Sequence, residues 1–274
     1  QIVIGVGGYA SAPTLKAAQS LGIPTLIQEQ NSYAGVTNKF LARRADKICV
    51  AYPDMERFFP KDKIVLTGNP IRPAIEHLNA DRREALEHFG LPLDTERVVV
   101  VVGGSLGARS INESIGSRLK EWADSGVALI WQTGVAFEEK AKELLAGYHF
   151  PVYSSAFIQR MDLAYTIADV VVSRAGASAI SELCLLGKPT ILVPSPNVAE
   201  DHQTKNALAL STRSAAILIP DKEAREELTP RAIALVKDAT QCASLSDEIR
   251  KLALTSAADK IVDEVEVLLS SKKE

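Results

Sequence analysis

The feature that most constrains this chain is a regular alternation of short apolar segments with longer segments of helical spacing. The clearest apolar segment is the unbroken valine run Val98–Val102. Such a run is typical of a parallel strand, because helices cover both faces of a parallel sheet. The alternation therefore predicts an α/β fold built on parallel sheets.

The same alternation places the individual elements. Strands are expected at Gln1–Val6, Pro24–Gln28, Lys47–Ala51, Lys63–Thr67, Arg97–Val102, Ala128–Gln132, Val170–Ser173, Pro189–Val193 and Ala215–Ile219. Helices are expected at Ala12–Leu21, Val36–Arg44, Asp81–Phe89, Ser110–Trp122, Ala136–Leu145, Ala179–Leu186 and Gln203–Leu210. Helical spacing without strands then continues through Arg231–Val236, Leu245–Leu252 and Ile261–Leu269.

A stretch with two prolines and a glycine, Gly68–Pro73, interrupts the alternation and predicts a hinge. The 274 residues fit two domains. We expect a first domain over residues 1–73, a second over 74–256, and a C-terminal helix in 257–274 that packs back on the first. Because the chain opens at once on a strand of buried type, without a methionine or a polar leader, the first domain is expected to be incomplete.

The composition excludes several classes of protein. The 31 lysines and arginines against 34 aspartates and glutamates give a net charge of −3, without the basic excess of a general nucleic-acid binder. The three cysteines are too few and too scattered for a disulfide framework or a zinc site, which fits a reducing cytoplasm. No apolar run approaches the roughly 20 residues of a membrane-spanning helix.

Four small-residue loops follow expected strands, where ligands bind in open α/β sheets. The first, Gly5–Ser11, resembles a loose dinucleotide fingerprint with Glu29 at the end of the next strand, although a tight turn explains its glycines equally well. The second, Gly103–Ser110, offers backbone amides, the Ser105 hydroxyl and a helix N-terminus to a diphosphate. It lacks the Gly-Lys-Ser/Thr of a Walker A loop.

The third loop, Ser173–Glu182, carries an acid in the first turns of a helix. Glu182 is placed to accept hydrogen bonds from two ribose hydroxyls, or only to complement the helix dipole. The fourth loop, Asp201–Ala207, is a polar helix start after a strand, and its lone histidine predicts no metal site. Two further polar features are the stretch Gln28–Gly35 and Arg72 at the hinge, which is either a cleft residue or a solvated charge.

Taken in order, these blocks resemble one family. The blocks are Gly7-Gly8-Tyr9-Ala10-Ser11, Glu29-Gln30-Asn31, Ala34-Gly35-Val36-Thr37-Asn38-Lys39, Gly68-Asn69-Pro70-Ile71-Arg72, Gly103-Gly104-Ser105-Leu106-Gly107-Ala108, Ser173-Arg174-Ala175-Gly176-Ala177, Ser181-Glu182 and Asp201-His202-Gln203 with Asn206-Ala207. The family is that of the bacterial transferases that move N-acetylglucosamine from UDP-N-acetylglucosamine to lipid I, undecaprenyl-diphospho-N-acetylmuramoyl-pentapeptide, and so make lipid II in peptidoglycan synthesis. The blocks cover nearly the whole chain.

The resemblance implies a GT-B glycosyltransferase, with two Rossmann-like domains facing a cleft, inversion at the anomeric carbon, and neither a metal nor another cofactor. It implies that the second domain holds the nucleotide-sugar. The substrate-binding residues it implies are Asn31, Arg72, Ser105, Ile158, Ala177, Ser178, Ala179, Ile180, Ser181, Glu182 and Gln203. In this assignment Ser105 meets the diphosphate, the Ile158 backbone meets the uracil, Glu182 meets the ribose hydroxyls and Gln203 meets the sugar.

The chain departs from the family pattern in two places. The family's first glycine-rich loop, which carries a proposed catalytic histidine, is absent, and the deficit resembles two to three βα units. The family histidine before Glu29-Gln30-Asn31 is replaced by Gln28. The catalytic base is therefore unknown, and Glu29 is the one titratable candidate in that stretch.

In the mechanism implied, the acceptor's C4 hydroxyl attacks the anomeric carbon and UDP leaves, its charge stabilised by the Gly103–Ala108 amides and helix dipoles. No clustered Asp-x-Asp is present to bind a metal. The resemblance implies a peripheral protein on the cytoplasmic side of the bacterial inner membrane. Two basic and apolar stretches fit an anionic surface, Lys39–Leu41 with Arg43-Arg44, and Phe58–Lys61, although an ordinary amphipathic helix and a turn explain them as well.

Three alternatives stay open on the sequence. One is an NAD(P)-binding oxidoreductase that uses Gly5–Ala10 and Glu29, which leaves the later loops unexplained. Another is a different GT-B enzyme, such as a UDP-sugar epimerase. The third is a protein that binds UDP-N-acetylglucosamine but transfers nothing, because it lacks the first glycine-rich loop.

Overall fold

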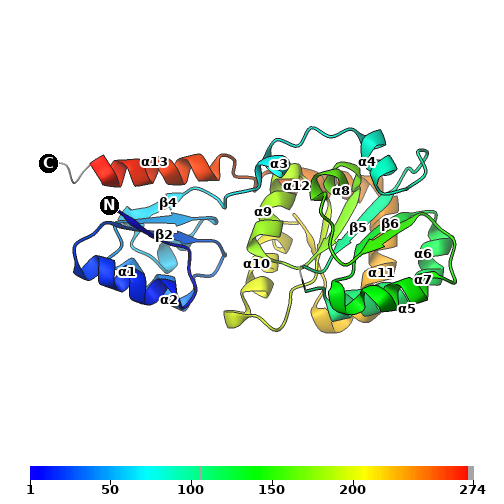
Figure 1. The fold of residues 1–274 in the computed structure, drawn as a ribbon, viewed down its shortest axis with the longest axis horizontal. Coiled ribbons are helices and arrows are strands. Elements are labelled where there is room, and N and C mark those ends of the chain that lie inside the picture. Colours follow the sequence, from blue (N-terminus) through cyan, green and yellow to red (C-terminus); the bar gives the residue numbers. More distant parts are fainter. Residues whose placement is uncertain (105, 271–274) are drawn as a thin grey trace. The chain divides into compact units, whose positions relative to one another are not determined.

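The computed structural model describes residues 1–104 and 106–270. Contacts between residues divide the chain into two compact units, which are described separately. Unit 1 comprises residues 1–71 and the C-terminal residues from 254 on, and unit 2 comprises residues 72–253. Both units contain a parallel sheet with helices (Figure 1). The α/β class expected from the sequence is confirmed.

Unit 1 is built on a four-stranded parallel sheet of order β1-β2-β3-β4. Its elements are β1 (Val3–Gly5), α1 (Ser11–Ser20), β2 (Thr25–Glu29), α2 (Val36–Ala42), β3 (Lys47–Val50), two short 3-10 helices (Met55–Arg57 and Lys61–Lys63), β4 (Ile64–Leu66) and α13 (Ala257–Ser270). Side chains alternate across the strands, so β2 and β3 supply two apolar faces. One face packs with Leu15 of α1 and Leu41 of α2.

The other face of the unit 1 sheet packs against α13. Leu26 of β2 and Cys49 of β3 form a small buried cluster with Leu268, and Ile261 and Val265 pack on it. An ion pair of 3.1 Å between Lys47 Nζ and Glu264 Oε2 lies beside this cluster. The last helix of the chain therefore belongs to the same unit as the first strands, and it covers the face that α1 and α2 leave (Figure 1).

Unit 2 is built on a six-stranded parallel sheet of order β10-β9-β8-β5-β6-β7. Its elements are α3 (Pro73–Glu76), α4 (Arg82–His88), β5 (Val98–Val102), α5 (Arg109–Ser117), α6 (Leu119–Ser125), β6 (Ala128–Gln132), a 3-10 helix (Val135–Phe137), α7 (Glu138–Leu145), β7 (Val152–Ser155), α8 (Met161–Ile167), β8 (Val170–Ser173), α9 (Ala177–Leu186), β9 (Thr190–Leu192), a 3-10 helix (Ala199–Asp201), α10 (His202–Ser211), β10 (Ile217–Leu218), α11 (Asp221–Lys237) and α12 (Ala239–Arg250).

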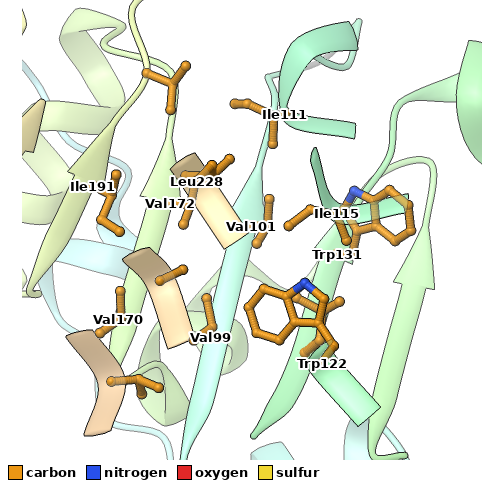
Figure 2. Close-up of a cluster of buried hydrophobic side chains, with 14 of the residues drawn as sticks. Val99, Val101, Ile111, Ile115, Trp122, Trp131, Val170, Val172, Ile191 and Leu228 are labelled. Atoms are coloured by element: carbon orange, nitrogen blue, oxygen red, sulfur yellow. The ribbon is translucent and has the colours of Figure 1, made fainter. Parts of the chain in front are cut away.

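This strand order is that of a doubly wound Rossmann sheet, in which the chain moves outward from β5 to β7 and then restarts beside β5 at β8. Right-handed crossovers in opposite directions put the connecting helices on opposite faces. The valine run is the centre of the sheet. Val99 and Val101 pack with Ile115 of α5, Trp131 of β6 and Leu228 of α11 in the main buried cluster (Figure 2).

Three local differences from the sequence expectation have physical reasons. The expected helix Ser110–Trp122 is two helices, because Arg118 leaves the helical region with φ −127° and ψ 28°. Strand β7 was not expected because it is a half-buried edge strand that pairs on one side only and lacks an apolar run. The seven-residue helix α8, which was also missed, is too short to show a periodic pattern.

Candidate functional site

The candidate site of unit 2 lies at the carboxyl ends of its strands. Strands β5 and β8 are neighbours, and the chain leaves them toward opposite sides of the sheet. The loops that follow such a switch point are where open α/β sheets bind ligands. The loops after β5 and β8, the second and third loops of the sequence analysis, are these two.

The loop after β5 depends on glycines for close backbone contacts. A Cβ on Gly103 would lie 2.6 Å from the amide nitrogen of Ala108, and a Cβ on Gly107 would lie 2.4 Å from the carbonyl oxygen of Thr133. Gly104 and Gly107 have φ values of 85° and 78°, which side chains rarely adopt. The loop ends at α5, whose N-cap residue Ala108 provides no side-chain cap. Ser105 lies outside the described residues.

Gln132, the last residue of β6, connects two loops of the site. Its Nε2 donates to the Gly104 carbonyl oxygen at 2.8 Å, and its Oε1 accepts from the Ile158 backbone N–H at 3.2 Å. The side chain is buried. Sequence reasoning missed Gln132, although a glutamine that ends a buried strand of apolar residues was a usable signal.

Ile158, expected to meet a uracil through its backbone, follows β7 and is itself buried. Because its N–H donates to Gln132, that group is already engaged inside the protein. The expected contact of Ile158 with a base is therefore narrowed to its carbonyl oxygen, and it stays a prediction.

Helix α9 begins immediately after the third loop. Its N-cap residue, Gly176, has no side chain, so the first amides of the helix receive no side-chain cap. The predicted residues Ala177, Ser178, Ala179, Ile180, Ser181 and Glu182 form the first turns of this helix. Ser178 is exposed and Ile180 is buried. The Ser181 hydroxyl donates to the Ala177 carbonyl at 3.0 Å, within the helix.

The Glu182 carboxylate lies in a buried network with two residues from distant parts of the chain. Arg72 donates from Nε to Oε1 at 2.9 Å and from Nη2 to Oε2 at 3.1 Å. Tyr165 of α8 donates from its hydroxyl to Oε2 at 3.1 Å. The Glu182 side chain is 8% exposed, whereas that of Arg72 is 55% exposed. Arg72 and Glu182, both predicted site residues, are thus in direct contact. Tyr165 also contacts Glu182, and the sequence analysis did not predict it.

The remaining predicted residue of unit 2, Gln203, lies in the first turn of α10. Its Oε1 accepts from the Ser195 N–H at 2.9 Å and so closes the loop after β9. Asn206, one turn later, is fully buried and donates to the Ala175 carbonyl in the loop after β8. These two bonds attach α10 to both loops. The lone histidine of this segment, His202, lies 2.8 Å from the Ala199 carbonyl through Nδ1.

In unit 1 the carboxylate of Glu29 is buried at the end of β2. Its Oε1 accepts from the Asn31 N–H, and its Oε2 accepts from the Gly35 N–H at 3.0 Å and from Asn38 Nδ2 at 2.8 Å. These hydrogen bonds fix the loop between β2 and α2. In the structure Glu29 therefore holds this loop, and its role as a base or a ribose ligand stays a prediction. Asn31, whose N–H and Nδ2 both face Glu29, is held by it.

The described part of the chain contains neither a metal-binding cluster nor a helix that could span a membrane. Among residues 1–104 and 106–270, no group of three or more histidine, cysteine, aspartate or glutamate side chains is arranged to hold a metal ion. No helix formed by those residues combines the length and the apolar character needed to cross a bilayer.

Comparison with known families agrees with this geometry. Residues 98–261 match the glycosyltransferase family 28 C-terminal domain, and residues 1–50 match the N-terminal domain of the same family. Solved structures at low identity share the fold, among them a UDP-GlcNAc 2-epimerase from Neisseria meningitidis, with a TM-score of 0.65 at 14% identity. The class that the fold and the site define is that of GT-B glycosyltransferases of family 28.

Relatives at high identity define the family more narrowly. A UDP-N-acetylglucosamine–N-acetylmuramyl-(pentapeptide) pyrophosphoryl-undecaprenol N-acetylglucosamine transferase of Porphyromonas gingivalis is 63% identical over 99% of this chain and 72% of its own length. Its namesake in Parabacteroides distasonis is 57% identical over 99% of this chain and 74% of its own length. The crystal structure of Acinetobacter baumannii MurG matches with a TM-score of 0.76 at 30% identity, over 97% of this chain and 73% of that one.

The chain belongs to the family of these N-acetylglucosamine transferases, as the resemblance in the sequence predicted. It is a glycosyltransferase. Neither an NAD(P)-binding oxidoreductase nor an inactive binding protein receives support from these relatives.

Proposed function

We propose that this chain transfers N-acetylglucosamine from UDP-N-acetylglucosamine to lipid I, giving lipid II and UDP in peptidoglycan synthesis. The relatives named for this reaction, at 50–63% identity over at least 96% of the chain, carry the proposal. The arrangement of unit 2 supports it, because the glycine loop after β5, Ile158 and Glu182 all lie at the carboxyl edge of one sheet.

In this proposal the donor nucleotide binds to unit 2. The diphosphate lies on the amides of the Gly103–Ala108 loop and on the N-terminus of α5, where backbone N–H groups and the helix dipole favour negative charge. The N-terminus of α9 supplies a second set of backbone N–H groups, because its N-cap residue Gly176 has no side chain to cap them. The ribose hydroxyls meet Glu182, the uracil meets the Ile158 backbone, and Gln203 meets the sugar. Arg72 completes the proposed substrate-binding residues of unit 2, and Asn31 is the one proposed for unit 1.

The reaction balances without a redox partner. The C4 hydroxyl oxygen of the acceptor forms a bond to the anomeric carbon as the bond from that carbon to the diphosphate oxygen breaks, and the configuration inverts. The hydroxyl proton passes to a base or to water, and the electron pair of the broken bond stays on the UDP oxygen. Negative charge develops on the departing UDP. Preorganised amides and helix N-termini stabilise that charge because they are aimed at it before the reaction begins. The base is not assigned to a residue: Glu29, the one titratable candidate of its stretch, is engaged by the loop between β2 and α2 through both oxygens.

The proposal includes peripheral binding at the cytoplasmic face of the inner membrane. Its support in the chain is α2, where Val36 and Phe40 are 66% and 63% exposed and the basic Arg43 and Arg44 follow. The second stretch expected to contact a membrane, Phe58–Lys61, does not expose its two aromatic side chains as α2 exposes Val36 and Phe40. Phe59 is buried in the core of unit 1, and Phe58 packs against that core.

A transfer assay tests the proposed function. The chain is incubated with UDP-N-acetylglucosamine labelled in the sugar and with a lipid I analogue, and the label in the lipid product and the release of UDP are measured. We expect equal amounts of both products, unaffected by a chelator of divalent cations. Binding of UDP without any transfer to the acceptor would contradict the proposal, as would transfer only after a metal is supplied.

A further inference from the structure

Tyr165 is a buried tyrosine whose hydroxyl has a charged partner. It lies on α8 with 3% of its surface exposed, and its hydroxyl is 3.1 Å from Glu182 Oε2. Burial, and then the neighbouring Glu182 charge, raise the pKa of Tyr165 above its ordinary value. The phenol therefore keeps its proton and acts as a permanent donor to the carboxylate.

The two partners of Glu182 differ in how easily they can leave it. Tyr165 is enclosed by the core of unit 2, and its ring has nowhere else to place its hydroxyl without a repacking of α8. Arg72 has more than half of its side chain in solvent. An ionised carboxylate accepts about four hydrogen bonds. Arg72 and Tyr165 supply three, so two ribose hydroxyls fit only if Arg72 gives up at least one of its positions.

We infer that Tyr165 is a positioning residue of the donor site, which holds the Glu182 carboxylate in place through Oε2 while the ribose hydroxyls of the nucleotide replace Arg72. The inference rests on the proposed function, in which Glu182 reads the ribose. It adds a residue on another helix, outside every motif of the sequence, whose hydroxyl sets the orientation of that carboxylate. The nucleotide then binds to a Glu182 carboxylate that is already oriented, so binding loses less free energy in ordering that side chain.

Replacing Tyr165 by phenylalanine tests this inference, because Tyr165→Phe removes one oxygen and leaves the packing of the ring. The affinity of the full chain is measured for UDP and for 2′,3′-dideoxy-UDP, which lacks both ribose hydroxyls. We expect Tyr165→Phe to weaken the binding of UDP about tenfold, the size of one hydrogen bond to a charged group, and to leave the dideoxy analogue unaffected. In the transfer assay KM for the donor rises and kcat changes little.

Tyr153→Phe is the matched control. Tyr153 lies on β7 of the same unit, where its ring packs on Phe89. This variant should bind both nucleotides as the unchanged chain does. If Tyr165→Phe weakened both nucleotides equally, the tyrosine would have a general structural role and the inference would be overturned. Unchanged discrimination between UDP and its dideoxy analogue in Tyr165→Phe would overturn it as well.

The proposed function and the inference fail in different ways. If the unchanged chain bound UDP and dideoxy-UDP equally, the ribose would not be read at Glu182 and the inference would be overturned, whereas the transfer assay would still decide the proposed function. If the unchanged chain preferred UDP and Tyr165→Phe preferred it equally, only the role of Tyr165 would be lost. A variant Glu182→Gln keeps an oxygen for the Tyr165 hydroxyl, and we expect it to lose most of the preference for UDP.

Discussion

Gly107 and Gly134 meet backbone to backbone at the edge of the candidate site. A Cβ on Gly134 would lie 2.6 Å from both the Cα and the amide nitrogen of Gly107. Gly134 has φ 75° and ψ 154°, a region that only glycine adopts readily. A buried network supports this contact, since Asn112 donates to the Thr133 carbonyl at 2.7 Å and accepts from the Trp131 indole at 2.9 Å. The glycine loop is therefore braced by the neighbouring strand-end turn.

The first prediction concerns this contact. Gly134→Ala adds a Cβ against backbone in a conformation that alanine avoids, and we expect it to lower the free energy of unfolding of unit 2 by about 2–4 kcal/mol. Urea unfolding followed by tryptophan fluorescence measures it, because both tryptophans of the chain, Trp122 and Trp131, lie in the core of that unit.

Gly147→Ala is the control for Gly134→Ala. Gly147 lies after α7, has no positive φ, and a Cβ there would meet nothing within 4 Å. It should leave the stability unchanged or raise it slightly, since alanine restricts the unfolded chain. Equal effects of the two variants would contradict the argument from close backbone contact.

A second prediction concerns Gln132. Gln132→Met keeps the length of the side chain but leaves the Gly104 carbonyl and the Ile158 N–H without their partner. The Ile158 N–H is buried, and leaving a buried group without a partner costs about 1–3 kcal/mol. We expect a loss of stability in that range and an affinity for UDP that is lower by about tenfold, because the two loops lose their common tether.

Isothermal titration with UDP measures the affinity of Gln132→Met. Gln241→Met, in α12 and far along the chain from these loops, is the comparison and should bind UDP normally. Gln132→Glu keeps an acceptor for Ile158 and loses the donor to Gly104, so its affinity should fall between those of the other two. An unchanged affinity in Gln132→Met would show that the two loops do not depend on this side chain.

A third prediction separates two roles for Glu29. Glu29→Gln places a donor amide where Gly35 and Asn38 supply donors, so we expect unit 1 to lose about 1–3 kcal/mol of stability. The reactivity of the buried Cys49 thiol with a thiol reagent reports on unit 1 and should rise. Glu56→Gln, at an exposed glutamate of the same unit, should leave it unchanged. A catalytic base would instead show abolished transfer with unaltered Cys49 reactivity.

A fourth prediction follows from the packing of α13 against Cys49 of β3. Burial, with the Glu264 charge as the next cause, raises the pKa of the Cys49 thiol from 9.0 to about 11. The thiol of the unfolded chain loses its proton at lower pH than that of the folded chain. The contribution of Cys49 to the free energy of unfolding is therefore fully present below pH 9 and is lost as the pH rises from 9 to 11. The expected loss is about 2–3 kcal/mol.

Hydrogen exchange of the β2 and β3 amides across this pH range measures the loss in unit 1. Cys49→Ala should remove most of the slope. Leu268→Ala, which opens the contact of α13 with Leu26 and Cys49, should increase Cys49 labelling at neutral pH. If Cys49 labelling were the same with and without Leu268, α13 would not cover the thiol in solution.

The sequence by itself determined the class of fold and most of the strands and helices. Runs such as Val98–Val102 and the small-residue loops after them depend on local periodicity and backbone sterics, which neighbouring residues decide. The motifs were specific enough to predict the family, which the relatives confirm. The edge strand β7 was missed because a half-buried strand has no apolar run to show it.

Only the tertiary structure decided the partners of the polar site residues. Arg72 and Glu182 are 110 residues apart, and Gln132 bonds to Gly104 and Ile158, which are 28 and 26 residues away from it. No local pattern encodes such pairs, because a side-chain hydrogen bond depends on positions that the packing of the whole unit fixes. The same reason gives the buried Glu29 carboxylate its partners Gly35 and Asn38, and makes Tyr165, outside every motif, the neighbour of Glu182.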